Sequence, residues 1–187
     1  MMPTALGLDR ATTALAIIDV QEKLAAAMDA SLMKPAVANI ERLLTTAKLL
    51  QLPTLVSEQY PEGLGPTVAA IAEHLGDVPR LPKVEFDAMK NAGFAAKLGA
   101  TKAKAVILAG IEAHICVVQT AASLLARGYD VWIARDAVAS RTPANMEAGL
   151  ALMHDAGAKL APTETILFWL VERAGTPEFK TVSKLVR

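Results

Sequence analysis

The chain has 187 residues, a length sufficient for one domain whose hydrophobic core needs no disulfide or metal. Its 19 basic and 19 acidic residues balance, and no cluster of Lys and Arg forms a stripe suited to nucleic acid or a membrane surface, so we expect neither as a partner. Although 53% of the residues are hydrophobic, charged residues interrupt every long apolar run, which argues against a membrane-spanning helix. We predict a single soluble domain over residues 1–187.

The start of the chain and its cysteine content indicate the compartment. Residues 1–9 lack the basic segment, apolar core and cleavage site of a secretory signal. The single cysteine cannot form an intramolecular disulfide, which agrees with a reducing environment. We therefore expect a cytoplasmic protein. Its apolar composition without net charge favours subunit contacts, so we also expect a homo-oligomer, a dimer, tetramer or larger assembly.

Short apolar runs alternate with helical periodicity along the whole chain, and this alternation is typical of a parallel sheet covered by helices. In chain order, we predict strands at residues 14–18, 54–57, 105–109, 130–134 and 159–161, and helices at about 35–50, 68–74, 92–98, 115–126, 143–156 and 164–173. Pro and Gly residues between positions 58 and 83 predict an irregular, functional connection. The predicted fold is α/β, a three-layer α/β/α architecture with a doubly wound, mostly parallel sheet of about six strands.

Asp19 follows the first predicted strand directly. Ligands of open α/β sheets bind at the carboxyl ends of the strands, so Asp19, Glu58 and residues 110–116 should lie along one edge of the sheet, which is the predicted site. Partial burial there would raise the pKa of Asp19, as suits a base. Alternatively, Asp19 caps the following helix, and the spacing does not separate the two roles.

Cys116 lies at a predicted strand-to-helix junction after the turn residue Gly110. At such a junction the free N–H groups and the dipole of the helix lower the pKa of a thiol toward the reactive thiolate. The alternative is that a lone cysteine is a small buried hydrophobic residue. Lys83 follows a proline-rich stretch and has apolar neighbours, so it is either a buried lysine that needs a partner or an ordinary solvated one. Together, a thiol, a carboxylate and an ammonium form the set that acyl transfer requires.

Three segments of the chain resemble the signature segments of the isochorismatase-like cysteine hydrolases: Asp19-Val20-Gln21, Lys83 with Phe86 downstream, and Gly110-Ile111-Glu112-Ala113-His114-Ile115-Cys116-Val117. The resemblance spans nearly the whole chain. It implies a doubly wound α/β fold and a catalytic triad of Asp19, Lys83 and Cys116. It also implies an oxyanion hole made by the backbone N–H groups of Glu112 and Cys116, with a cis peptide bond between Ile111 and Glu112.

The activity that this resemblance implies is hydrolysis of a small amide or related carbonyl substrate at a carbon–nitrogen bond, through a thioester acyl-enzyme. Asp19 would accept the thiol proton, Lys83 would stabilise the thiolate and orient the carboxylate, and Cys116 would attack the carbonyl. Two rivals of other classes remain open: a non-catalytic oligomeric binding or scaffold protein, and a thiol redox sensor that uses Cys116. Neither rival needs Asp19.

Nicotinamidases and true isochorismatases are narrower alternatives within the family. Nicotinamidases bind a metal through an Asp-x-His pair and a further His, whereas this chain has Ser57-Glu58-Gln59-Tyr60-Pro61 at the corresponding place. Glu58 and His74 alone do not make a zinc site. We therefore expect no metal and no cofactor. Enzymes that hydrolyse the vinyl ether of isochorismate typically lack the nucleophilic cysteine, so Cys116 counts against that reaction.

Several residues are candidates for the substrate pocket by position only: Gln21, Gln59, Tyr60, Phe86 and His114. For His114, a loop histidine bonded to the backbone is an equal alternative. Asp136, Ser140 and Arg141 also follow a strand, and we expect them to brace a loop with hydrogen bonds. The segment Glu58-Gln59-Tyr60-Pro61, together with residues 110–114, resembles a branch of the family whose substrates are largely undefined.

Overall fold

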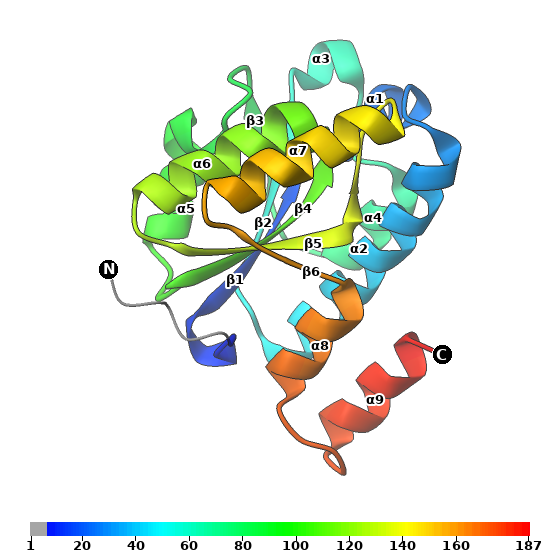
Figure 1. Cartoon of the computed structure of the whole chain (residues 1–187), viewed down its shortest axis with the longest axis vertical. Helices are drawn as coiled ribbons and strands as arrows, with labels where there is room; N and C mark the ends of the chain where they lie inside the picture. The colour runs from blue at the N-terminus through cyan, green and yellow to red at the C-terminus, as the bar shows by residue number, and fades with distance from the viewer. Residues whose placement is uncertain (1–6) are drawn as a thin grey trace.

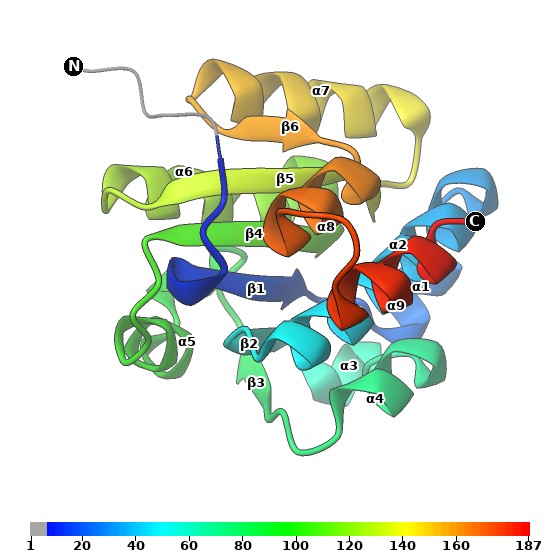
Figure 2. The same cartoon turned by 90° about the horizontal axis from the view of Figure 1, so that it is seen from below.

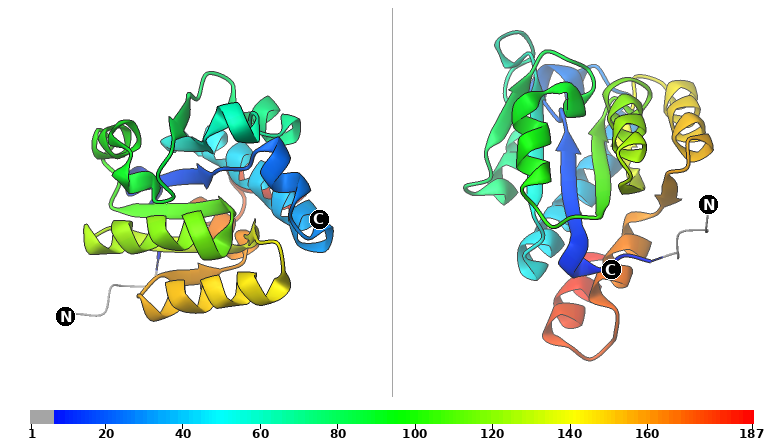
Figure 3. Two further views of the ribbon diagram at one scale, coloured as in Figure 1. Left: turned by 90° about the horizontal axis from the view of Figure 1, so that it is seen from above. Right: turned by 90° about the vertical axis from the view of Figure 1, so that its left-hand side faces the viewer.

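The computed structural model describes residues 7–187 and has a six-stranded parallel sheet with strand order β3-β2-β1-β4-β5-β6. Helices cover both faces of the sheet, which confirms the predicted fold class (Figure 1). The strands are β1 (Thr13–Ile18), β2 (Thr54–Gln59), β3 (Arg80–Lys83), β4 (Ala105–Ile111), β5 (Asp130–Ala139) and β6 (Lys159–Ala161). Figures 2 and 3 show the same layers from other sides.

The helices differ widely in length. They are α1 (Glu22–Ala26), α2 (Ala30–Leu50), α3 (Pro61–Leu64), α4 (Ala69–Leu75), α5 (Ala92–Gly99), α6 (Val118–Ala126), α7 (Pro143–Asp155), α8 (Thr163–Val171) and α9 (Pro177–Leu185), with short turns η1 (Arg10–Thr12), η2 (Ala88–Lys90) and the π-helical turn η3 (Ala113–Val117). In the part of the chain that the structure describes, none of the helices combines the length and the apolar character needed to cross a bilayer.

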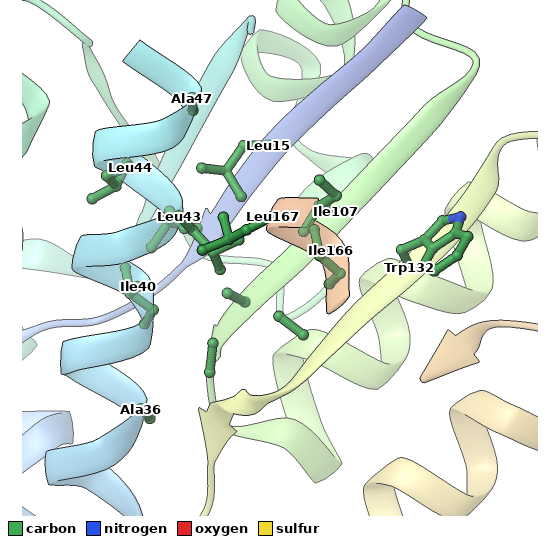
Figure 4. Packing of buried hydrophobic residues seen from close by; sticks show 14 of the residues in the cluster. Leu15, Ala36, Ile40, Leu43, Leu44, Ala47, Ile107, Trp132, Ile166 and Leu167 are labelled. Atoms are coloured by element: carbon green, nitrogen blue, oxygen red, sulfur yellow. The ribbon is translucent and has the colours of Figure 1, made fainter. Parts of the chain in front are cut away.

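The central strand β1 is buried along its whole length because successive side chains enter two different cores. Leu15 and Ile17 face the core under α2 and α8, whereas Ala16 and Ile18 face the core under α5 and α6. Figure 4 shows the first of these cores, with labelled side chains from β1, β4, α2 and α8: Leu15, Ile107, Ile40, Leu43, Leu44, Ile166 and Leu167. Apolar residues on consecutive positions therefore predicted this strand correctly.

The main differences from the predicted elements lie where the local pattern is weak. The connection from 58 to 83 contains the edge strand β3, which pairs with β2 through register partners such as Gln59 and Lys83. Helix α2 begins at Ala30, before Pro35, because the Asp29 carboxylate caps it by accepting the Ser31 N–H. Strand β5 continues to residue 139 across a register shift. The short α1 and α3 and the final α9 were not predicted.

Gly110 allows β1 and β4 to stay paired up to their carboxyl ends. Its φ of +119° is a conformation that only glycine adopts readily, and a Cβ added there would lie 2.1 Å from the Ile18 carbonyl oxygen. The close approach aligns the residue after β1, Asp19, with the segment after β4. The fold thus places two predicted site segments next to each other.

Candidate active site

Asp19 lies just after β1 in the left-handed region, with φ of 52°, and its side chain is fully buried. Its Oδ1 accepts a hydrogen bond from the Ser57 hydroxyl at 2.8 Å, and its Oδ2 accepts one from Lys83 Nζ at 2.7 Å. Asp19 therefore faces the site and does not cap a helix; the N-cap position of α1 is Gln21. Burial raises the pKa of the Asp19 carboxyl, and Lys83 works in the opposite direction.

Lys83 ends β3 with a fully buried side chain, so the solvated alternative is wrong. Besides Asp19, its Nζ donates to the side-chain Oε1 of Gln59 at 2.6 Å and lies 3.0 Å from the Glu85 carbonyl oxygen and 3.3 Å from that of Phe86. An ammonium has three N–H donors, and these acceptors use all of them. The contacts hold the charge of Lys83 against the Asp19 carboxylate.

Cys116 lies in the π-helical turn η3, directly before α6, and only 5% of the residue is exposed. The Asp19 carboxylate, Lys83 and the backbone N–H of Glu112 all act on its thiol. Burial and the nearby Asp19 carboxylate raise the pKa of the thiol to about 12, although Lys83 and the Glu112 N–H lower it. The predicted depression of this pKa is therefore wrong, because desolvation outweighs the effect of the helix start.

The segment before Cys116 is held by contacts to the end of β5. The bond between Ile111 and Glu112 is cis. The buried Glu112 carboxylate pairs with Arg141, with Oε1 to Nη2 at 2.8 Å, and His114 Nδ1 lies 3.0 Å from the Ser140 hydroxyl. His114 is thus bonded to a side chain, and its predicted alternative bond to the backbone is wrong. The expected loop-bracing role of Ser140 and Arg141 agrees with these contacts.

The candidate pocket residues separate into two groups. Gln21 is fully buried and bridges the backbone of Gln59 and Gly65, so it braces the end of β2 against the residue that follows α3. Gln59 is buried as well, and its amide holds Lys83 and the Val84 carbonyl. Tyr60 and Phe86 are about half exposed, at 55% and 53%, and follow the carboxyl ends of β2 and β3. These two remain at the rim of the site.

The described residues contain no group of three or more His, Cys, Asp or Glu side chains placed to hold a metal. Glu58 instead accepts hydrogen bonds from the Thr67 N–H and hydroxyl, and His74 lies beside the Thr45 hydroxyl. The two residues serve different local contacts.

The sequence reasoning missed two contacts of this site. Ser57 donates to Asp19 although nothing in its local sequence marks it; its register position opposite Ile18 on the neighbouring strand is the only signal. The pairing of Glu112 with Arg141 joins positions 29 residues apart, which a local pattern does not reveal. Both contacts arise where strand ends meet.

Comparisons with known proteins identify the family and the fold. Residues 13–165 match the family model described as the isochorismatase domain. The secreted isochorismatase effector Isc1 of Phytophthora sojae is 40% identical over 151 residues, covering 78% of this chain and 71% of that protein. The MAR1 ribonuclease from Caenorhabditis elegans superposes with a TM-score of 0.89 and 37% identity, over 96% of this chain and 92% of that one. YcaC from Pseudomonas aeruginosa, solved with hexane-2,5-diol and covalent acrylamide, superposes with a TM-score of 0.87 and 25% identity, over 97% of this chain and 92% of that one.

Proposed function

The chain belongs to the isochorismatase family of hydrolases, and on that premise we propose that it hydrolyses a carbon–nitrogen bond of a small amide or related carbonyl compound through a thioester on Cys116. The observation that carries the proposal is the buried ion pair of Asp19 and Lys83 beside the Cys116 thiol, both of whose charges act on that thiol. A thiol with a pKa of about 12 does not ionise unaided at neutral pH. A base beside the thiol is therefore needed, and Asp19 is our candidate for it.

In the first half-reaction, Asp19 takes the thiol proton while the sulfur attacks the substrate carbonyl carbon. The backbone N–H groups of Glu112 and Cys116 donate to the developing oxyanion. When the carbon–nitrogen bond breaks, the proton on Asp19 passes to the leaving ammonia or amine. Lys83 orients Asp19 during these steps and favours its ionised form before the first and after the last of them.

In the second half-reaction, a water molecule attacks the thioester and loses a proton to Asp19. The carbon–sulfur bond breaks, the product leaves as a carboxylic acid, and the proton returns to the sulfur of Cys116. One amide bond and one water are consumed, and the site is restored. No metal or cofactor enters these steps.

The size of the substrate follows from the accessibility of the nucleophile. With 5% of Cys116 exposed, the sulfur is reached by a small carbonyl group more readily than by a polymer. The ribonuclease name of the nematode relative makes RNA cleavage a second activity to test, but the zero formal net charge of this chain favours the small substrate. The name of the Phytophthora relative makes isochorismate a further test substrate, alongside nicotinamide.

The decisive experiment traps the acyl-enzyme. The chain is incubated with a panel of small amides and quenched in acid, and the intact mass and the modified peptide are then measured, while ammonia release is followed in parallel. We expect an acyl adduct on Cys116 that is absent in Cys116→Ala and strongly reduced in Asp19→Asn. RNA and isochorismate are assayed with the same variants.

Four outcomes would overturn parts of the proposal. Full turnover by Cys116→Ala would show that Cys116 is not the nucleophile. Alkylation and turnover unchanged in Asp19→Asn would show that Asp19 is not the base, whereas alkylation of the wild type without any turnover would favour a thiol sensor. Binding of ligands without turnover would favour a scaffold protein. We also propose a cytoplasmic homo-oligomer, which sedimentation of the purified chain and fractionation of cells test directly.

A further inference from the structure

Arg141 lies in the turn between β5 and α7 and holds a carboxylate of the nucleophile segment. We propose that Arg141 is a positioning residue that acts through the Glu112 side chain to hold the backbone of Glu112 and the turn η3 that carries Cys116. The effect of Arg141 on turnover rests on the proposed function, in which the Glu112 N–H is an oxyanion donor. The effect of Arg141 on the reactivity of the Cys116 thiol does not depend on that function.

The contact between the two side chains is a fork with several hydrogen bonds. Arg141 Nη2 donates to Glu112 Oε1 at 2.8 Å, Nε lies 3.2 and 3.1 Å from the two carboxylate oxygens, and the Arg141 backbone N–H donates to Oε2 at 3.3 Å. The Glu112 side chain is only 4% exposed, whereas that of Arg141 is 58% exposed. A buried carboxylate needs such partners, so Arg141 determines where the Glu112 side chain rests.

The same stretch of chain holds the turn at two more points. The buried Ser140 hydroxyl contacts His114 Nδ1 at 3.0 Å. On α7, a Cβ added to Gly149 would lie 2.8 Å from the Ala113 carbonyl carbon and the His114 nitrogen, so the helix packs directly on the backbone of η3. Residues 140–149 therefore form the support of the turn that carries Cys116. Among the described residues, the pair of Arg141 and Glu112 is the only ion pair in that support.

The Glu112 backbone is joined to this turn, because its carbonyl oxygen accepts the N–H groups of Ile115 and Val117 at 3.0 and 3.2 Å. The backbone N–H of Glu112 lowers the pKa of Cys116, opposing burial and the Asp19 carboxylate. If the Glu112 side chain lost its anchor, this N–H would no longer be held in place. The thiolate, and with it the oxyanion of the proposed reaction, would lose a donor.

The experiment compares Arg141→Gln, Glu112→Ala and the double variant, with Arg135→Gln as control because Arg135 is an exposed arginine on β5, the strand that leads to Arg141. The rate of Cys116 alkylation by iodoacetamide at pH 8 is the first readout. We expect Arg141→Gln to slow alkylation about 10-fold, the effect of losing one donor to a charged group, and Arg135→Gln to leave it unchanged. The kcat for an amide substrate should fall by a similar factor with KM within about twofold. Arg141→Lys, which keeps the charge but not the fork, should recover part of the rate.

The double variant decides whether Arg141 acts through Glu112. We expect Arg141→Gln to have no further effect in the Glu112→Ala background. Two independent losses that multiply, or an Arg141→Gln rate equal to that of Arg135→Gln, would overturn the inference. If Arg141→Gln does not fold, Arg141→Lys at the wild-type alkylation rate would overturn it as well. If the wild-type chain is alkylated but hydrolyses no amide, the proposed function is wrong. The alkylation rates of the variants still test whether Arg141 positions Glu112.

Discussion

The buried ion pair of Asp19 and Lys83 allows a direct test of how this site is stabilised. Their charged atoms are 2.7 Å apart, and both side chains are fully buried. At an effective dielectric constant of ~20 the attraction is about 6 kcal/mol. Removing each ion from water costs several kcal/mol, roughly enough to offset that attraction. The pair as a whole should therefore add little to stability, whereas either charge alone should be costly.

Asp19→Asn keeps the shape of the side chain and leaves the ammonium of Lys83 buried without a counter-ion. Truncating one partner of such a pair costs about 3–5 kcal/mol. Because Gln59 and two backbone carbonyls still accept hydrogen bonds from Lys83, we expect the lower end of that range, about 3 kcal/mol. Adding Lys83→Met removes the orphaned charge, so the double variant should be more stable than Asp19→Asn alone by at least ~1 kcal/mol.

Urea unfolding followed by tryptophan fluorescence measures these free energies, since Trp132 is buried in the folded chain. The matched control is the pair of Asp130 and Lys159, which has the same 2.7 Å distance but side chains that are 24% and 16% exposed. Asp130→Asn should cost about 1 kcal/mol or less because solvent screens that pair. The reasoning would be refuted if Asp19→Asn cost no more than this control, or if the double variant were no more stable than Asp19→Asn.

Three further predictions concern the thiol, a glycine and the rim. Burial raises the pKa of Cys116 to about 12 from an unfolded value of 9.0, so the stability that the neutral thiol contributes is full below pH 9 and is lost as pH rises toward 12. From pH 8 to 10 the wild type should lose about 1.4 kcal/mol of unfolding free energy relative to Cys116→Ser. Unfolding free energies of the two proteins that change in parallel with pH would contradict the raised pKa. Gly110→Ala should lower the unfolding free energy by more than ~3 kcal/mol in thermal or urea unfolding, because the added Cβ would meet the Ile18 backbone. Gly128→Ala is the control, since Gly128 is also at positive φ but has open space around it, and should cost about 1 kcal/mol. Equal losses would show that the close approach to Ile18 is unimportant. Phe86→Ala should leave the unfolding free energy within about 0.5 kcal/mol but raise KM for an amide substrate, and an unchanged KM would remove Phe86 from the substrate entrance.

Much of the fold could be predicted from the sequence because its signals are local. Apolar runs at consecutive positions marked β1 and β4, whose burial on both faces requires them, and the alternation with helical periodicity marked the parallel sheet. The edge strand β3 was missed because Arg80, Pro82 and Lys83 do not form an apolar run, and its pairing with β2 is a tertiary contact. The cytoplasmic location and the oligomeric state stay predictions.

By itself, the sequence determined which groups lie at the carboxyl edge of the sheet, since the position of Asp19 after a strand and of Cys116 before a helix follows from the order of the chain. Only the tertiary structure decided how those groups behave. The pKa of Cys116 depends on burial and on the charges of the residue after β1 and of Lys83 in β3. The anchor of Glu112 comes from the turn after β5, and Gln21 is a brace because the end of β2 and Gly65 meet at its side chain. Periodicity and capping are properties of neighbouring residues, whereas desolvation and charge pairing depend on segments that meet only in the folded chain.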